Sequence, residues 1–433
     1  MLACRVLRRG LGMQACRLNL TQFIAALFTV LVLTSGASLH AEDWPQWRGP
    51  RGDGTSVESN VPVHWSATEN VCWKTPIPGT GHSSPVIWGD RIFLTTCLEG
   101  DEERMLLCLD RVSGKILWQN EVLKSPLEKK HKLNSYASAT PSTDGKRVWV
   151  AFFQKPQIEL VCYDFDGKEV WRKSPGEFHS VHGFCSSPIL YKDLVILNCD
   201  QDSASACIVA YDRASGEEKW RTERPNRTRS YCTPIIRTLA GREQLLISGS
   251  KSVASYDPST GKQLWLIDGP TEQFVASLVE TDGIVFCTCG FPTLHLIGIN
   301  PDGSGNVTNT NVIWHDHRGA SYVPSPIAAG DWFFVVSDGG VATCWEAKTG
   351  NLLWKQRLGS HHSASPVSAK GNLYFPADNG DMFVLKAGPT FELVSQNSLG
   401  EECRASPAIS QGEIFIRTLN NLYCISGAVS APK

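Results

Sequence analysis

The sequence lacks the local signatures of several large enzyme classes. It contains no Gly-x-Ser-x-Gly nucleophile elbow, no phosphate-binding P-loop and no Gly-x-Gly-x-x-Gly dinucleotide fingerprint. It has neither a Cys-x-x-Cys pair nor a His-x-x-x-His spacing, so we expect no metal site of the zinc type. These absences disfavour serine hydrolases, nucleotide-dependent enzymes and zinc enzymes.

The sequence also lacks an excess of positive charge. It has 41 Lys and Arg against 43 Asp and Glu, which gives a formal net charge of −2 at pH 7. A nucleic-acid-binding chain would show a basic stripe or a high isoelectric point. We therefore expect no nucleic-acid partner.

A run long enough to span a membrane is missing at the N-terminus. The apolar segment at residues 23–33 is shorter than the about 20 residues that a spanning helix needs. Four arginines and no acid precede it, and small or polar residues follow it up to Ala41. This order predicts a signal peptide over residues 1–41 and an exported protein, periplasmic or extracellular. No cysteine directly follows the run, so a lipid anchor is not expected, and membrane contact would need an uncleaved signal anchor or a partner.

The cysteines do not form an obvious disulfide framework. Loss of Cys4 and Cys16 with the signal peptide would leave an odd number of the 15 cysteines. Cys199 and Cys207 flank one predicted hairpin and could form a bridge in an oxidising compartment. Other cysteines recur at one position of the repeat described next, where small side chains alternate: Cys108, Cys162, Ala210, Ser255, Cys344 and Cys424. That pattern indicates a small buried slot.

An internal repeat organises the rest of the chain. Each module begins with a small residue, a Ser or Thr and a Pro, which we call the head, and an apolar strand follows. Seven heads end at Pro85, Pro141, Pro188, Pro234, Pro326, Pro366 and Pro407. The gap between Pro234 and Pro326 is about twice the usual spacing. Ala276, Ser277 and Leu278 lie near its middle, so we count them as a degenerate eighth head.

The end of the module repeats as well. An Asp, Asn or Glu is followed a few residues later by a Gly, and a Trp follows a few residues after that. The acid or amide side chain caps a tight turn, and the Gly closes this turn at positive φ. A Trp in this position offers a large flat face and an N–H group to the neighbouring module. The predicted docking residues are Trp73, Trp118, Trp171, Trp220, Trp265, Trp314 and Trp354.

Four short strands in each module, with no helical stretch, predict an all-β fold. Repeats of about 40–56 residues are typical of propeller blades, and a closed ring leaves no exposed sheet edge. The chain stops after the last head without a Trp, whereas Trp73 precedes the first head. We therefore predict an eight-bladed β-propeller of four-stranded blades, closed by the N-terminal strand. Residues 42–69 would be an N-terminal extension packing on the propeller, residues 70–426 the propeller and residues 427–433 a tail.

The heads and the Asp-Gly-Trp tails resemble the tryptophan-docking repeats of the pyrroloquinoline-quinone-like propeller family. That family includes quinoprotein alcohol dehydrogenases and non-enzymatic relatives such as the propeller subunit of the outer-membrane β-barrel assembly machinery. The segment from Trp44 through Trp47 to Pro50 resembles the opening of exported bacterial quinoprotein-like propellers. The resemblance implies the fold and export more than an activity.

For an enzyme of this family, the resemblance implies a quinone held between a Trp and a ring of two adjacent disulfide-bonded cysteines. It also implies Ca²⁺ bound by Glu and Asn oxygens and an Asp as general base. This sequence has no adjacent cysteine pair, and Cys287 and Cys289 are the nearest to one. We therefore expect no cofactor and no catalysis; the alternative is a dehydrogenase that depends on pyrroloquinoline quinone and Ca²⁺.

Polar and aromatic residues directly before the heads suggest a binding funnel at one end of the channel. Aromatic rings and arginines there would bind an anionic or planar group by stacking and paired hydrogen bonds. The alternative is that these side chains only form hydrogen bonds with backbone groups at the ends of strands. The candidates are His82, Tyr136, His182, Phe184, Arg229, Tyr231, Phe274, Tyr322, His361, His362, Glu402 and Arg404, with Gln273 beside them. We expect a monomer that binds a protein partner or a small polar ligand here.

The leader pattern gives a first testable prediction. The mature protein should begin at or near Glu42, because the small-residue segment ends at Ala41. N-terminal sequencing of the purified exported protein measures this directly. A membrane-bound protein that still carries residues 1–41 would contradict it.

Overall fold

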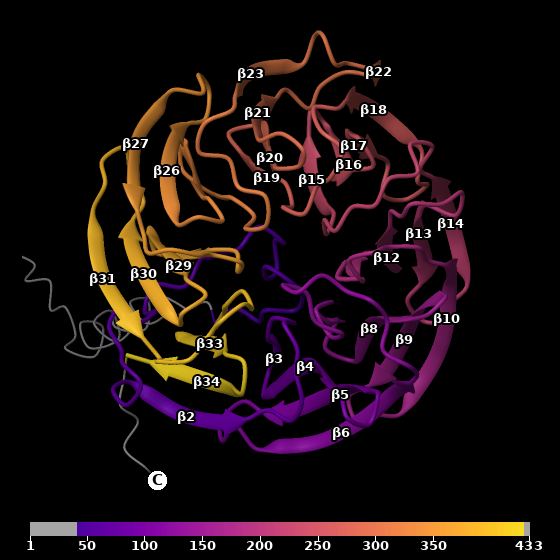
Figure 1. Cartoon of the computed structure of the whole chain (residues 1–433), viewed down its shortest axis with the longest axis vertical. Coiled ribbons are helices and arrows are strands. Elements are labelled where there is room, and N and C mark those ends of the chain that lie inside the picture. The colour runs from indigo at the N-terminus through magenta and orange to yellow at the C-terminus, as the bar shows by residue number, and fades with distance from the viewer. Residues whose placement is uncertain (1–40, 428–433) are drawn as a thin grey trace, which may run out of the picture. The chain divides into compact units, whose positions relative to one another are not determined.

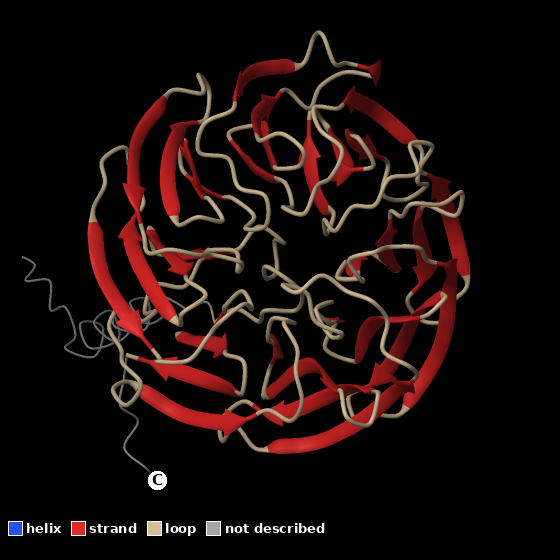
Figure 2. Cartoon of the chain, in the orientation of Figure 1, coloured by secondary structure: helices blue, strands red, loops and turns tan. Residues whose placement is uncertain are grey.

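A computed structural model describes residues 41–427 of the chain. Most of the predicted signal peptide, residues 1–40, and the end of the tail, residues 428–433, lie outside the described residues. The described residues form strands and loops and contain no helix (Figure 2). No helix long and apolar enough to cross a membrane was therefore found between residues 41 and 427. The predicted all-β fold is confirmed.

The first four blades follow each other along the chain. Blade 1 contains β3 (Val86–Trp88), β4 (Arg91–Leu98), β5 (Glu103–Asp110) and β6 (Ile116–Lys124). Blade 2 contains β7 (Ser142–Thr143), β8 (Arg147–Gln154), β9 (Gln157–Asp164) and β10 (Glu169–Glu177). Blade 3 contains β11 (Ile189–Tyr191), β12 (Leu194–Cys199), β13 (Cys207–Asp212) and β14 (Glu218–Glu223). Blade 4 contains β15 (Ile235–Leu239), β16 (Arg242–Gly249), β17 (Ser252–Tyr256) and β18 (Gln263–Asp268), extended by β22 (Gly305–Asn306).

The last four blades complete the ring. Blade 5 contains β19 (Val279–Thr281), β20 (Ile284–Cys289), β21 (His295–Ile299) and β23 (Val312–Asp316). Blade 6 contains β24 (Ile327–Ala329), β25 (Trp332–Val336), β26 (Val341–Glu346) and β27 (Leu352–Arg357). Blade 7 contains β28 (Val367–Ala369), β29 (Asn372–Pro376), β30 (Asp381–Lys386) and β31 (Leu393–Ser398), extended by β1 (Thr55–Ser56). Blade 8 contains β32 (Ala408–Ser410), β33 (Glu413–Arg417), β34 (Asn421–Ser426) and β2 (Val71–Pro76).

The N-terminal strand closes the ring as predicted. Strand β2 is antiparallel to β34 and forms the outermost strand of blade 8, with Trp73 opposite Cys424 and Thr75 opposite Leu422. Figure 1 shows the indigo β2 beside the yellow β34, with the other blades following around the ring. Chain ends that are far apart in sequence therefore share one sheet.

Burial patterns explain why inner and outer strands differ in sequence. Strand β4 is buried along nearly its whole length, because both faces of a middle strand pack against neighbouring blades. The outer strand β2 alternates half-buried and exposed residues, so only one of its faces is covered. The continuous apolar runs in the sequence are thus the blade interiors.

The Trp side chains dock on the next blade in six of the seven predicted cases. Each indole Nε1 donates to a backbone carbonyl in the neighbouring turn; Trp171, for example, donates to Arg213 O at 3.0 Å. The Gly of that turn lies under the ring: a Cβ on Gly216 would come within 2.8 Å of the Trp171 ring, and its φ is +70°. The same type of bond is made by Trp73, Trp118, Trp220, Trp314 and Trp354.

Trp265 is the exception to the predicted docking. Its Nε1 donates to Gln244 Oε1 at 2.7 Å, within its own blade 4. The turn that would have received it is the expanded one between β21 and β23, where β22 instead pairs in parallel with β18. Because the insertion changes the neighbouring turn, this Trp bonds to its own sheet although it is fully buried.

The heads are joined by a ring of hydrogen bonds that we call the hydroxyl belt. In seven successive pairs, the backbone N–H of the Ser or Thr in one head donates to the side-chain hydroxyl of the next head, over 2.9–3.3 Å. Its members are Ser84, Thr140, Ser187, Thr233, Ser277, Ser325, Ser365 and Ser406. Ser277 takes part fully, so the degenerate head is a true eighth module.

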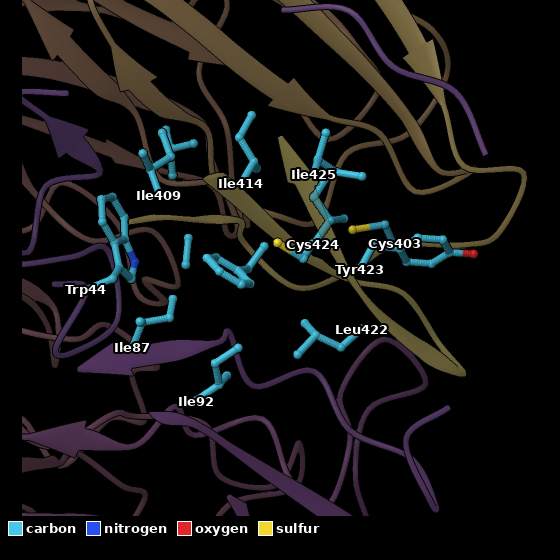
Figure 3. Packing of buried hydrophobic residues seen from close by; sticks show 14 of the residues in the cluster. Trp44, Ile87, Ile92, Cys403, Ile409, Ile414, Leu422, Tyr423, Cys424 and Ile425 are labelled. Atoms are coloured by element: carbon cyan, nitrogen blue, oxygen red, sulfur yellow. The ribbon is translucent and has the colours of Figure 1, made fainter. Parts of the chain in front are cut away.

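At the seam between blades 8 and 1, a buried arginine connects the blades. Arg417, at the end of β33, donates to Ser83 Oγ and to Thr95 O, both at 2.7 Å. A side chain on Gly81 would collide with the guanidinium, which explains the Gly at that position. Next to it, Figure 3 shows Trp44, Ile87 and Ile414 in one apolar cluster that joins the two ends of the chain.

The segment before β2 crosses the channel. Trp44 exchanges two backbone hydrogen bonds of 2.9 Å with Ile87 in the innermost strand of blade 1. Asp53 forms an ion pair of 2.7 Å with Arg237 in the innermost strand of blade 4, and β1 pairs with the innermost strand of blade 7. Figure 1 shows this indigo segment in the middle of the ring. The channel is therefore occupied below the heads.

The docking geometry predicts the cost of removing a Trp. Trp220→Ala should lower the free energy of unfolding by about 3–5 kcal/mol, because the indole is buried and its Nε1 donates to Pro258 O. Leu353→Ala, at an exposed apolar residue of the outer strand β27, is the matched control and should change it by no more than about 0.5 kcal/mol. Denaturant unfolding measures both, and equal effects would contradict the docking role.

Candidate functional site

A cavity of about 560 Å³ lies at the end of the channel where the heads meet. Seven members of the hydroxyl belt form its wall, all except Ser277. Trp47, from the segment that crosses the channel, also lines it. The cavity lies at the end of the channel where the funnel was predicted and is bounded by loops that the blades hold in place, while its role in binding stays a prediction.

Half of the predicted funnel residues line this cavity. They are His82, His182, Arg229, Tyr231, Tyr322 and Arg404, and Gln273 lies with them. They come from blades on opposite sides of the ring, because the rotation of the propeller carries each pre-head position onto the next. Tyr231 and Gln273 are almost fully buried, and Tyr322 Oη donates to Gln273 Oε1 at 3.1 Å.

The other six predicted residues lie outside the cavity lining, and the structure corrects their placement. Phe184 packs edge-on against Phe178 in the interior, and Phe274 is completely buried in another core cluster. Tyr136 lies against the cationic groups of Arg104 and Lys130. Phe184 and Phe274 stabilise the blades because their rings turn inward, whereas Tyr136 is half-buried beside two cations. Sequence position alone does not settle which way such a side chain points.

The remaining three are polar. His362 is buried, and its two ring nitrogens bond to the carbonyl oxygens of Leu358 and Pro376. His361 is exposed outside the cavity, as expected for neighbours that point to opposite sides. Glu402 is also exposed and forms an ion pair with Arg404 at 3.3 Å, so it acts on the cavity only through that arginine.

Two histidines and two arginines determine the charge of the cavity lining. The pKa of His82 falls to about 3 because the side chain is buried and Arg417, Arg404 and Lys130 lie near it. Burial and the Arg229 guanidinium also lower the pKa of His182. Both histidines are therefore neutral near pH 7, and the guanidinium groups of Arg229 and Arg404 are the cationic groups of the lining. Such a surface favours an anionic group.

Both arginines are held by an acid yet keep a spare donor. Arg229 Nη1 forms an ion pair with Asp202 Oδ2 at 2.7 Å. The Nε atoms of Arg229 and Arg404 are buried and have no hydrogen-bond partner among the described residues. Buried unpaired donors cost about 1–3 kcal/mol each, so a rotation of either guanidinium toward an acceptor on a bound group would be stabilising.

Sequence reasoning missed several lining residues, among them Trp47, His131 and Asp338. Asp338 accepts hydrogen bonds from the backbone N–H groups of Tyr322 and Val323, at 2.7 and 3.1 Å, and so fixes the loop that carries Tyr322. A signal existed, because Asp378 does the same for Ser363 in the next blade. Both aspartates precede a Gly-containing turn at the same point of the module.

The cysteines form no disulfide in the described residues. All of them there are free thiols, including Cys199 and Cys207, which lie opposite each other across β12 and β13. Burial raises the pKa of the Cys108 and Cys162 thiols to about 12, so they remain protonated and pack as small apolar groups.

Two clusters outside the cavity have the donor atoms of a metal site. One contains His295, His315 and His317, and the other contains Cys72, Glu413 and Cys424. The sequence did not predict either cluster, because the spacings considered were Cys-x-x-Cys and His-x-x-x-His, which turns and helices bring together. Strands place ligands two residues apart.

The comparison with known families identifies the type of propeller. The family described as "Outer membrane protein assembly factor BamB" matches residues 105–282 and 306–389, more than half of the chain. The chain belongs to this BamB family. A stretch of 104 residues is 33% identical to outer membrane protein assembly factor BamB of Burkholderia pseudomallei (strain K96243), covering 24% of this chain and 26% of that protein. The match thus spans about a quarter of that relative's length.

Solved structures resemble this BamB-family propeller in fold. BamB from Moraxella catarrhalis has a TM-score of 0.59 at 12% identity, over 84% of this chain and 99% of that one. A quinohemoprotein alcohol dehydrogenase from Comamonas testosteroni has a TM-score of 0.64 at 13% identity, over 94% and 85%. A europium-containing methanol dehydrogenase has a TM-score of 0.59 at 10% identity, over 87% and 90%. At these identities the likeness shows the fold alone.

The lowered pKa of His82 predicts how stability depends on pH. Between its ordinary pKa of 6.5 and about 3, the unfolded chain binds a proton at this position that the folded chain does not. The free energy of unfolding should therefore decrease as the pH falls through this window.

The test compares variants at two pH values. Denaturant unfolding at about pH 7.5 and about pH 5 should show a smaller acid loss for His82→Gln than for the wild type. His361→Gln, at an exposed side chain outside the cavity, is the control and should behave like the wild type. If the free energy of unfolding decreased equally in all three proteins between the two pH values, the lowered pKa of His82 would be contradicted.

Proposed function

We propose that this chain is an exported, non-catalytic binding subunit of the BamB type, which takes part in outer-membrane protein assembly. The family match supports this role, and the cavity at the heads supplies a place for a partner. The observation that carries the proposal is the convergence of Arg229 and Arg404, each with a buried unpaired Nε, on one cavity of about 560 Å³. An acidic segment of a protein partner suits that chemistry best.

The rim of the funnel supports a protein as the partner. Phe291 is 50% exposed and Leu133 is 39% exposed, and both line the opening of the cavity. Exposed apolar side chains beside a charged pocket are typical of protein interaction sites, in which an apolar contact surrounds a polar anchor. A small polar ligand would need the arginines but not these two side chains.

The alternative, a quinone-dependent dehydrogenase, finds little support in the donor atoms. Asp338 is the one carboxylate among the lining residues described, and backbone N–H groups already occupy its oxygens. Ca²⁺ requires several oxygen ligands, and Cys185 is the one cysteine in the lining. The lining residues therefore do not fit the arrangement of Ca²⁺ and quinone that the resemblance to quinoprotein dehydrogenases implied.

The proposal predicts separate effects on binding and stability. A photo-crosslinking residue at position 291 should capture a partner in the native host, whereas the same residue at Leu353 should not. Arg404→Ala and Arg229→Ala should each reduce capture by more than tenfold, equivalent to about 1.4 kcal/mol. Arg404→Ala should change the free energy of unfolding by only about 0.5 kcal/mol.

Lys219→Ala, which removes a charge on the exposed outer strand β14, is the matched control and should leave capture unchanged. Equal capture by all variants would contradict the role of the funnel. Dye reduction with an alcohol, after addition of pyrroloquinoline quinone and Ca²⁺, would instead establish the dehydrogenase.

A further inference from the structure

Three histidines of blade 5 meet on the propeller face that carries the heads. Leu296 of β21 lies opposite Asp316 of β23, which places His295 opposite His317. His315 precedes His317 by two residues and therefore projects from the same side of the strand. Strand β21 starts and β23 ends at the edge where the heads lie, so the cluster is on the funnel side of the blade.

The three imidazoles are close enough to share one ion. Their ring centroids are 4.7–5.1 Å apart, and one ligand atom from each lies within 4.8 Å of the others. His295 Nδ1 is 2.9 Å from His315 Nε2. A tetrahedral Zn²⁺ site, with Zn–N bonds of about 2.0–2.1 Å, needs nitrogens about 3.3 Å apart, so small side-chain rotations are sufficient.

The loop between β20 and β21 orients two of the rings. His317 Nδ1 donates to Leu294 O at 2.9 Å; since a carbonyl only accepts, this nitrogen carries the proton and Nε2 keeps its lone pair. His295 Nε2 lies 2.6 Å from Thr293 Oγ1, which leaves Nδ1 facing His315. Hydrogen bonds of this type hold metal-binding histidines in metalloproteins.

Among the described residues, the acid that acts on this cluster is Asp316, which raises the pKa of His315 only as the smallest of the effects on that group. Asp316 lies between two of the histidines in sequence but projects to the other side of the strand, and its carboxylate binds Arg318 at 2.6 Å. Burial and the neighbouring rings lower the pKa of His295 and His315. Neutral imidazole is the form that binds metals.

We propose that His295, His315 and His317 bind one divalent transition-metal ion, with Zn²⁺ as the best match and a fourth coordination position open to solvent. Three nitrogen donors select a borderline ion such as Zn²⁺ or Cu²⁺ over Ca²⁺ and Mg²⁺, which need oxygen ligands. His315 and His317 are exposed, so the ion would be accessible from outside. The site is separate from the proposed binding of a partner in the funnel.

The test is metal titration of the purified mature chain after treatment with a chelator. Calorimetry should show one equivalent of Zn²⁺ bound, with no binding of Ca²⁺ at the same concentration. Co²⁺ should give the visible absorption of a tetrahedral nitrogen site, without a thiolate charge-transfer band. His317→Gln should weaken Zn²⁺ binding by at least tenfold, and His315→Gln combined with His317→Gln should abolish it.

Two controls separate this site from other donors. Cys72→Ser removes a thiol of the second cluster and should leave the histidine-dependent equivalent intact, as should His361→Gln, an exposed histidine elsewhere. Both histidine substitutions are at exposed positions, and an unchanged thermal melting curve shows that the variants fold. Wild-type affinity in the double variant, or loss of binding in Cys72→Ser instead, would overturn the proposal.

Discussion

The hydroxyl belt is the contact on which the rest of the ring depends. Each head presents a buried backbone N–H, and leaving such a donor unpaired costs about 1–3 kcal/mol. The hydroxyl of the next head accepts it, so one bond fixes the spacing and rotation of two blades. At the seam where the chain ends meet, Arg417 joins blade 8 to blade 1 with a buried guanidinium. Seven of the eight residues of the belt also form the wall of the cavity, so the contact that spaces the blades also shapes the site.

The features that repeat could be predicted from the sequence, because a repeated position has one physical role in every blade. Ser or Thr in the head and Gly before the Trp are such positions. The heads predicted the number of blades, and Trp73 before the first head predicted the closing strand. The insertion after β21 breaks the repetition, and there Trp265 turned to Gln244 in its own sheet. Sequence periodicity predicts a contact only while the partner blade keeps its length.

Features that occur once could not be predicted in this way. Residues directly before a head lie in loops, where no fixed alternation says which side chain points into the cavity; Gln273 lines it while Phe274 is buried. The segment before β2 that crosses the channel is a second case, because it is not part of any repeat. Arg48 in this segment is fully buried, and its guanidinium donates at 2.5 Å to the carbonyl oxygen of Pro326, which belongs to the head of blade 6. Only the folded ring brings such distant residues together.

The histidine cluster shows why a search for metal sites depends on secondary structure. A helix presents neighbours three or four residues apart, whereas a strand presents every second residue, so His315 and His317 form a pair only after β23 is known. The third ring comes from β21, through a register set by the blade. The loop that carries Thr293 and Leu294 against these rings also places Phe291 in the lining of the funnel. A partner that contacts Phe291 therefore touches the loop that orients the histidines, and the two proposed sites share one structural support.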